Sequence, residues 1–238
     1  MGTHGKTSGA IYRAADPIGH ATLVLAHGAG APRTHPFMTS MAARVAKRGI
    51  DVVTFNFLYA EAGRKMPDRV EVLEATWRAA IATVRARGGL PTERLFIGGK
   101  SMGGRMATHV AAAEDGLVLG GLVLLGYPLH PIGKPTIVRD EILRVKVPML
   151  VVQGTRDELG TAAEMTKLLA SHSRARVHVV EEGDHSLALP KRLGGERQEQ
   201  ELDAAADAIA AFVGGKTRAR PKKTAGPTKP AREKKRRG

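Results

Sequence analysis

The residues from Gly99 to Gly103 read Gly-Lys-Ser-Met-Gly, a spacing that can hold a serine ready to attack a carbonyl group. An apolar stretch, residues 95–98, precedes them, and a helical pattern follows from Met102 to Ala113. In so tight a turn from strand to helix the serine hydroxyl is pushed outward, and glycines flank it because a Cβ would collide with neighbouring backbone. The pattern predicts that Ser101 is an exposed nucleophile at a helix N-terminus.

The same residues resemble the end of a phosphate-binding loop, because Gly99, Lys100 and Ser101 form the Gly-Lys-Ser with which such loops finish. A phosphate loop also needs a glycine five residues before that last glycine, and Arg94 stands there. Strand-like residues occupy the place of the phosphate cradle. The spacing therefore excludes a phosphate loop, and the remaining alternative to a nucleophile is an idle serine in a glycine-rich turn.

Two further polar residues follow apolar stretches downstream, in the order expected for enzymes with such a turn. Asp157 comes after residues 147–152, and His185 comes after residues 177–180. Loops that follow parallel strands emerge at one edge of a sheet, so both side chains are expected beside the serine. A serine nucleophile needs a base to take its proton and a carboxylate to orient that base. The order predicts a catalytic triad of Ser101, His185 and Asp157.

Two neighbouring carboxylates compete for the orienting role. Glu158 lies beside Asp157, and Asp184 lies beside His185. Asp157 is favoured over Glu158 because it follows the strand and its glycine turn more closely. The alternatives without chemistry are a turn or helix cap for Asp157 and a simple loop position for His185.

A loop of small residues is the candidate for stabilising negative charge on the substrate oxygen. It contains Gly28, Ala29 and Gly30 and directly follows the apolar residues 22–26. Small side chains let backbone N–H groups approach an oxyanion. The N–H groups of Ala29 and Met102 are predicted to form the oxyanion hole, with Gly28 and Gly30 lining the pocket as the next candidates.

Three other residues near strand ends are weighed for a role at this site. His27 is interpreted as a brace for its turn rather than a base, since the base is already assigned. Tyr127 and His130 follow the strand at 121–125 and are expected to line the pocket, although a plain loop role for His130 is equally open.

The link from the strand at 121–125 to the next strand holds only a short helix near 139–145. It leaves no room for a lid, so the site is expected to be shallow and accessible to water.

Strand and helix patterns alternate along the chain, which predicts an α/β fold. The helices are amphipathic, and Asp68 with Glu71 and Thr161 with Glu164 look like helix starts. The strands are rich in Val, Leu and Ile without clean alternation, as in a mostly parallel, doubly wound sheet with helices on both faces. The predicted strands are Ala10–Arg13, Thr22–Ala26, Val52–Phe55, Leu95–Gly98, Gly121–Leu125, Met149–Gln153 and Arg176–Glu181.

Residues 10–213 resemble the α/β-hydrolase superfamily through the motifs at 27–30, at 99–103 and at 126–131, the last reading Gly-Tyr-Pro-Leu-His-Pro. They look like a lid-less branch related to dienelactone hydrolases, whose eukaryotic relatives include a testis-expressed protein and a subunit of a chromatin acetyltransferase complex. The resemblance implies the fold without a cap domain and the same triad. Dienelactone hydrolases use a cysteine nucleophile, and this chain has no cysteine, so lactone chemistry is not implied.

Composition limits the remaining possibilities. The 238 residues fit one domain plus a tail, and the absence of cysteine excludes disulfides and thiolate catalysis. The sequence calls for no metal and no cofactor. It shows no secretory signal and no bilayer-spanning apolar run, so a soluble cytoplasmic protein is expected. Residues 1–9 are expected to be a flexible N-terminus.

The positive charge is concentrated at the C-terminal end. Of the net charge of +14, residues 214–238 carry +10 and have no large apolar side chain. Such a segment cannot offset its ordering entropy by burial and is predicted to be a disordered tail. Residues 216–238 would attract nucleic acid or an anionic surface without sequence preference, or act only as a solubilising tail.

Two classes of function fit these features. One is a serine hydrolase of esterase type that acts on a small acyl substrate through the triad. The other is a non-catalytic, hydrolase-like binding module whose basic tail engages nucleic acid or another polyanion. The complete triad favours the hydrolase, because a binding module needs none of the three residues.

Overall fold

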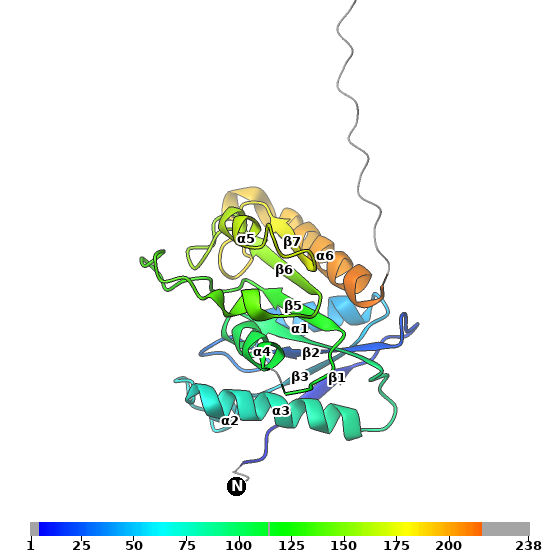
Figure 1. Ribbon diagram of the computed structural model, residues 1–238. Helices are drawn as coiled ribbons and strands as arrows, with labels where there is room; N and C mark the ends of the chain where they lie inside the picture. Colours follow the sequence, from blue (N-terminus) through cyan, green and yellow to red (C-terminus); the bar gives the residue numbers. More distant parts are fainter. Residues whose placement is uncertain (1–4, 114, 216–238) are drawn as a thin grey trace, which may run out of the picture.

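A computed structural model describes residues 5–113 and 115–215 of the chain. Its centre is a seven-stranded sheet in the order β1-β3-β2-β4-β5-β6-β7 (Figure 1). All neighbouring strands are parallel except β1, which is antiparallel to β3. The strands are β1 Gly9–Tyr12, β2 Ala21–Ala26, β3 Asp51–Phe55, β4 Arg94–Lys100, β5 Gly121–Leu125, β6 Met149–Gly154 and β7 Ala175–Val180. The prediction of a mostly parallel, doubly wound sheet is confirmed.

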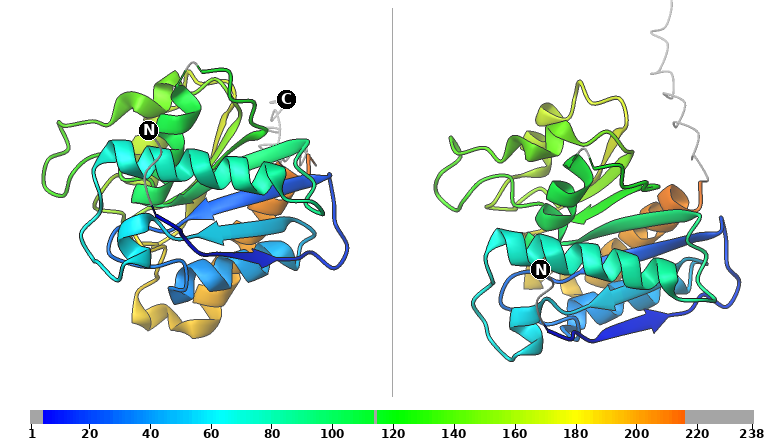
Figure 2. Two further views of the ribbon diagram at one scale, coloured as in Figure 1. Left: turned by 90° about the horizontal axis from the view of Figure 1, so that it is seen from below. Right: turned by 60° about the horizontal axis from the view of Figure 1, so that its bottom comes forward.

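Helices cover both faces of this sheet, as Figure 2 shows. One face packs against α1 and α6, and the other packs against α3, α4, α5 and the 3-10 helix η1. The helices are α1 Pro36–Ala46, α2 Leu58–Glu61, α3 Val70–Ala86, α4 Met102–Ala112, α5 Ala162–Leu168 and α6 Gly194–Val213, with 3-10 helices η1 Asp140–Arg144 and η2 Lys191–Leu193. Strands β2, β3, β5 and β6 are buried along their whole length, which explains why their sequences show no alternation.

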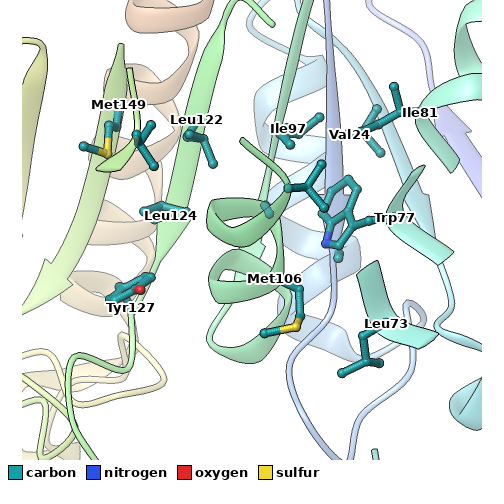
Figure 3. Close-up of a cluster of buried hydrophobic side chains, with 14 of the residues drawn as sticks. Val24, Leu73, Trp77, Ile81, Ile97, Met106, Leu122, Leu124, Tyr127 and Met149 are labelled. Atoms are coloured by element: carbon teal, nitrogen blue, oxygen red, sulfur yellow. The ribbon is translucent and has the colours of Figure 1, made fainter. Parts of the chain in front are cut away.

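The core on the α3–α4 side holds the helix that carries the predicted nucleophile. Trp77 of α3 is fully buried and lies beside Met106 of α4 and Ile97 of β4 in this cluster (Figure 3). Its indole Nε1 donates a hydrogen bond of 3.2 Å to the carbonyl oxygen of Gly103, in the first turn of α4. The core therefore fixes the start of α4 by both packing and a directed polar contact.

Local signals differ in how well they place the helix ends. Thr161 and Glu164 form a capping box at the start of α5, as predicted. The predicted start at Asp68 is wrong, because α3 begins after Arg69 without a side-chain cap. The Asp68 carboxylate instead accepts a hydrogen bond of 2.7 Å from Arg64.

The structure tests the predicted limit of the domain at the N-terminal end but not the predicted tail at the C-terminal end. The ordered part starts before Ala10, because Gly9 belongs to β1 and the backbone and hydroxyl of Ser8 both donate to Glu61. The predicted tail at 216–238 lies outside the described residues. None of the helices within the described ranges is both long and apolar enough to cross a lipid bilayer.

Candidate active site

Ser101 lies at a sharp turn between β4 and α4. Its backbone has φ +49° and ψ −116°, a region that residues other than glycine rarely adopt. The Ser101 N–H donates to the carbonyl oxygen of Leu125 on β5, at 3.0 Å, and so ties the turn to the next strand. Strain of this kind persists only where the surrounding structure enforces it, and it is frequent at functional sites.

The two glycines of the motif allow this turn to pack against the loop after β2. A Cβ on Gly99 would lie 2.3 Å from the carbonyl oxygen of Ala26, and one on Gly103 would lie 2.5 Å from the carbonyl oxygens of Ala26 and His27. Both distances are far below any real Cβ contact, and the obstacles are rigid backbone. The collision expected from the sequence is therefore present at both positions.

Ser101, His185 and Asp157 form a continuous chain of hydrogen bonds. The Ser101 hydroxyl lies 2.8 Å from Nε2 of His185. Nδ1 of the same imidazole donates to the Asp157 carboxylate at 2.9 and 3.0 Å. With the Nδ1 proton facing the carboxylate, Nε2 is the nitrogen left to accept the serine proton.

Asp157 is held rigidly at the end of this chain. Its side chain is fully buried, and its Oδ1 accepts a hydrogen bond of 2.8 Å from the backbone N–H of Leu159. Its Oδ2 accepts one of 2.8 Å from Nε2 of Gln153, a buried side chain on β6 that also bonds the backbone of Tyr127 and Gly160. Gln153 was not singled out in the sequence; the only signal was an uncharged polar residue inside an otherwise apolar strand.

Glu158 and Asp184, the alternatives to Asp157 for orienting His185, do not contact the imidazole. Glu158 is exposed to solvent, whereas Asp157 is buried. Asp184 accepts hydrogen bonds from the backbone N–H groups of Ser186 and Ala188, at 2.7 and 2.9 Å. It therefore shapes the loop that carries His185, while Asp157 contacts the imidazole.

A pocket of about 230 Å³ opens beside Ser101 and His185. It lies on the side of β2 and the start of α1, and its walls are Gly28, Ala29, Ala31, His35, Phe37, Met38, Lys100, Ser101, His185 and Ser186. Ala29 is on this wall, and Met102, the first residue of α4, directly follows the wall residue Ser101. Among the described residues, neither the backbone N–H of Ala29 nor the backbone N–H of Met102 donates to another protein group. Both N–H groups therefore remain able to bind an oxyanion.

The pocket differs from the one expected in three residues. Gly30 is not on its wall, and Tyr127 and His130 are not either. Tyr127 is fully buried in the core on the α4 side, because Gly126 (φ +59°) turns the chain inward after β5. His130 is buried as well and lies 3.6 Å from Glu164 at the start of α5. The three predicted lining positions are therefore corrected.

Two side chains from α1 take their place on the pocket wall. Phe37 and Met38 lie in the first turn of α1, where His35 caps the helix by accepting from the Phe37 N–H. Met38 is only 2% exposed and still borders the pocket. Phe37 and Met38 therefore make this part of the pocket wall apolar.

His27 braces the loop that carries Ala29. The imidazole is fully buried, its Nε2 accepts the Phe57 N–H at 3.1 Å, and its Nδ1 donates to the Gly28 carbonyl at 2.8 Å. Burial lowers the pKa of His27, because no carboxylate compensates a charge there. The neutral ring therefore links the loop of Gly28, Ala29 and Gly30, which we call the oxyanion loop after its predicted role, to the chain after β3. This agrees with the interpretation of His27 as a brace.

No group of three His, Cys, Asp or Glu side chains capable of holding a metal ion occurs within residues 5–113 and 115–215. The polar groups that line the pocket are hydroxyl, imidazole, amine and backbone N–H. This set can carry out nucleophilic attack, proton transfer and oxyanion binding with protein groups alone.

Comparisons with known proteins agree with the fold described above. Residues 19–214 match the family model described as an alpha/beta hydrolase domain. Solved structures of the same fold include an alpha/beta serine hydrolase without a lid from Xanthomonas campestris, at 21% identity and a TM-score of 0.67 over 90% of this chain and 91% of that one. An alpha/beta serine hydrolase homologue from Coxiella burnetii has 16% identity and a TM-score of 0.67, covering 86% and 92%.

A dienelactone hydrolase from Anabaena variabilis also shares the fold, at 18% identity and a TM-score of 0.65, covering 87% of this chain and 90% of that one. The further links to a testis-expressed protein and a chromatin complex stay a resemblance. Because the family match spans nearly all of the described residues, this chain belongs to the alpha/beta hydrolase family.

Proposed function

We propose that this protein is a serine hydrolase that cleaves small carboxylic esters. The observation that carries the proposal is the unbroken hydrogen-bond chain from Ser101 through His185 to Asp157, at the edge of a pocket. Each of the three side chains has the partner that the reaction needs before substrate arrives. The alpha/beta hydrolase fold supports the assignment, since it presents this geometry at the strand ends.

In the first half of the reaction the Ser101 hydroxyl attacks the ester carbonyl while Nε2 of His185 takes its proton. The resulting oxyanion is bound by the N–H groups of Met102 and Ala29. Asp157 orients the imidazole and stabilises its positive charge. His185 then protonates the leaving alcohol, and Ser101 remains as an acyl ester.

The second half uses water. His185 takes a proton from a water molecule that attacks the acyl carbonyl, and the oxyanion returns to the same two N–H groups. The intermediate collapses as His185 returns the proton to Ser101, which releases the acid. The link between β5 and β6, residues 126–148, contains only η1 as regular structure, so no lid hinders water at this step.

The pocket size sets the class of substrate. A volume of about 230 Å³ lies below the usual range for drug-sized ligands and suits a short acyl chain. We therefore expect acetate and butyrate esters to be cleaved with a higher kcat/KM than decanoate or longer esters. A clear preference for long-chain esters would contradict the pocket argument.

The experiment is a comparison of ester hydrolysis by the wild-type protein and two variants. Ser101→Ala should lower kcat on a short activated ester by about 10³-fold or more, because the nucleophile is lost. Ser173→Ala, an exposed serine outside the pocket, should leave the rate unchanged. Equal rates for wild type and Ser101→Ala would refute the proposed function.

A further inference from the structure

Lys100 is the lysine on the pocket wall. Its amine contacts the loop that carries His185. It is the last residue of β4 and directly precedes Ser101. Its Nζ donates a hydrogen bond of 2.6 Å to the main-chain carbonyl oxygen of His185, 85 residues further along the chain. The lysine thus joins the strand that carries the nucleophile to the loop that carries the base.

The backbone around this amine is packed closely enough to define its position. Gly126, after β5, has φ +59°, and a Cβ there would lie 3.0 Å from Nζ of Lys100 and 2.6 Å from the carbonyl oxygen of His185. The same Cβ would lie 3.7 Å from Oδ2 of Asp157. The amine, the His185 carbonyl and the Asp157 carboxylate therefore surround one glycine, which leaves room for the contact.

The charge of Lys100 is only partly compensated. No carboxylate of the described residues forms an ion pair with it, and its ammonium donates its hydrogen bond to the His185 carbonyl. Burial lowers the pKa of Lys100 to about 8, while the nearby charges of Asp157 and Asp184 support the ammonium. The amine can thus lose its proton under mildly alkaline conditions.

Four loops supply the groups that face Lys100. The loops after β6 and β7 contribute Asp157, Asp184 and His185, whereas the loops after β2 and β5 present Gly28 and Gly126 to the lysine. Besides Lys100 and His185, His35 also lies on the pocket wall as an ionisable residue. A hydrogen bond from an ammonium is about twice as strong as one from a neutral donor, so deprotonation weakens the link to His185.

We propose that Lys100 is a positioning residue, whose ammonium holds the main chain of His185 against β4 and so keeps the imidazole within reach of Ser101. The inference rests on the proposed serine hydrolase function. It implies that the rate falls when Lys100 loses its proton, although Lys100 takes no part in bond breaking. A misplacement of the base by a fraction of an ångström is enough to lower kcat, whereas binding of a small ester depends on it little.

The test compares pH profiles of short-ester hydrolysis between pH 6 and 10. In the wild-type protein kcat should fall above a midpoint near 8, the value set by Lys100. Lys100→Met should lower kcat at pH 7 by about 10- to 100-fold with KM changed less than threefold, and it should show no such alkaline fall. Lys100→Gln keeps an uncharged donor, so it should retain more activity than Lys100→Met and also lack the fall.

The matched control is Lys65→Met, which removes an exposed lysine with the same charge. It should reproduce both the wild-type rate and the alkaline fall. Melting curves of each variant check folding, and Lys100→Gln serves if Lys100→Met does not fold. An alkaline fall that persists in Lys100→Gln, or a Lys100→Met rate within twofold of wild type, would overturn the inference.

An NMR measurement separates this inference from the proposed function. With ¹³C-labelled histidine, Lys100→Met should shift the His185 signal and leave that of the buried His27 in place. An unchanged His185 signal would overturn the positioning role whether or not the protein hydrolyses esters. A wild-type protein that is inactive on every short ester would instead refute the proposed function alone.

Discussion

His27 offers a sharp test of how the oxyanion loop is held. The neutral ring makes two hydrogen bonds inside the protein, one from the Phe57 N–H and one to the Gly28 carbonyl. His27→Leu removes both and leaves the buried Phe57 N–H without a partner, whereas the Gly28 carbonyl keeps its hydrogen bond from the Tyr59 hydroxyl. At about 1–3 kcal/mol for one unsatisfied buried group, the free energy of unfolding should fall by about 1–3 kcal/mol. His27→Gln keeps an acceptor and a donor of similar reach, so it should lose less.

The pH dependence has a definite sign. Because burial lowers the pKa of His27 below 6.5, the unfolded chain takes up a proton before the folded protein does. The contribution of His27 to stability is therefore complete above pH 6.5 and is lost as the pH falls toward the lowered folded pKa. The slope is at most about 1.4 kcal/mol per pH unit, since one proton is involved.

The assay is thermal unfolding of the wild-type protein and of both variants between pH 5 and 8. For a domain of this size 1 kcal/mol corresponds to about 2–4 °C in Tm, so the His27 contribution should appear as a difference of several degrees per pH unit. The difference between wild type and His27→Gln isolates His27, because both share the opposite contribution of His109, whose pKa is raised. If that difference stays constant from pH 8 to pH 5, the neutral brace is wrong.

Two further predictions concern the orienting carboxylate and the C-terminal end. Asp157→Asn should lower kcat by about 10³- to 10⁴-fold because the amide favours the wrong imidazole tautomer, whereas Glu158→Gln, at an exposed position, should leave kcat unchanged; equal losses would contradict the choice of Asp157. Deletion of residues 216–238 should leave Tm and ester hydrolysis unchanged and remove any binding to DNA or anionic vesicles, which in the full chain should fall steeply with salt. A truncated protein that unfolds, or one that still binds DNA as the full chain does, would show that the charge of this segment was misread.

Most of the fold could be predicted because its determinants are local in the sequence. The seven predicted strands match the seven observed ones with ends correct to within two residues. The signal is clearest for β2, β3, β5 and β6, because a parallel strand buried on both faces favours apolar residues. Parallel topology then brings the ends of β4, β6 and β7 to one edge, which is why Ser101, Asp157 and His185 could be proposed together.

The pocket walls could not be predicted in the same way, because they depend on directions that the sequence pattern leaves open. Whether Tyr127 faces the pocket or the core is decided by the left-handed turn at Gly126. The place of Phe37 depends on the angle at which α1 leaves the oxyanion loop, which His35 fixes by capping the helix. The support of Asp157 by Gln153 needs the register of β6 as well as its presence.

The most direct test of the central claim is covalent labelling with a fluorophosphonate probe, followed by mass spectrometry of the intact protein and its peptides. The account predicts one added probe per chain, on the peptide that contains Ser101, with no labelling of Ser101→Ala and strongly slowed labelling of His185→Ala. Ser173→Ala should label at the wild-type rate. A wild-type protein that stays unlabelled, or one that carries the probe on a residue other than Ser101, would contradict the account.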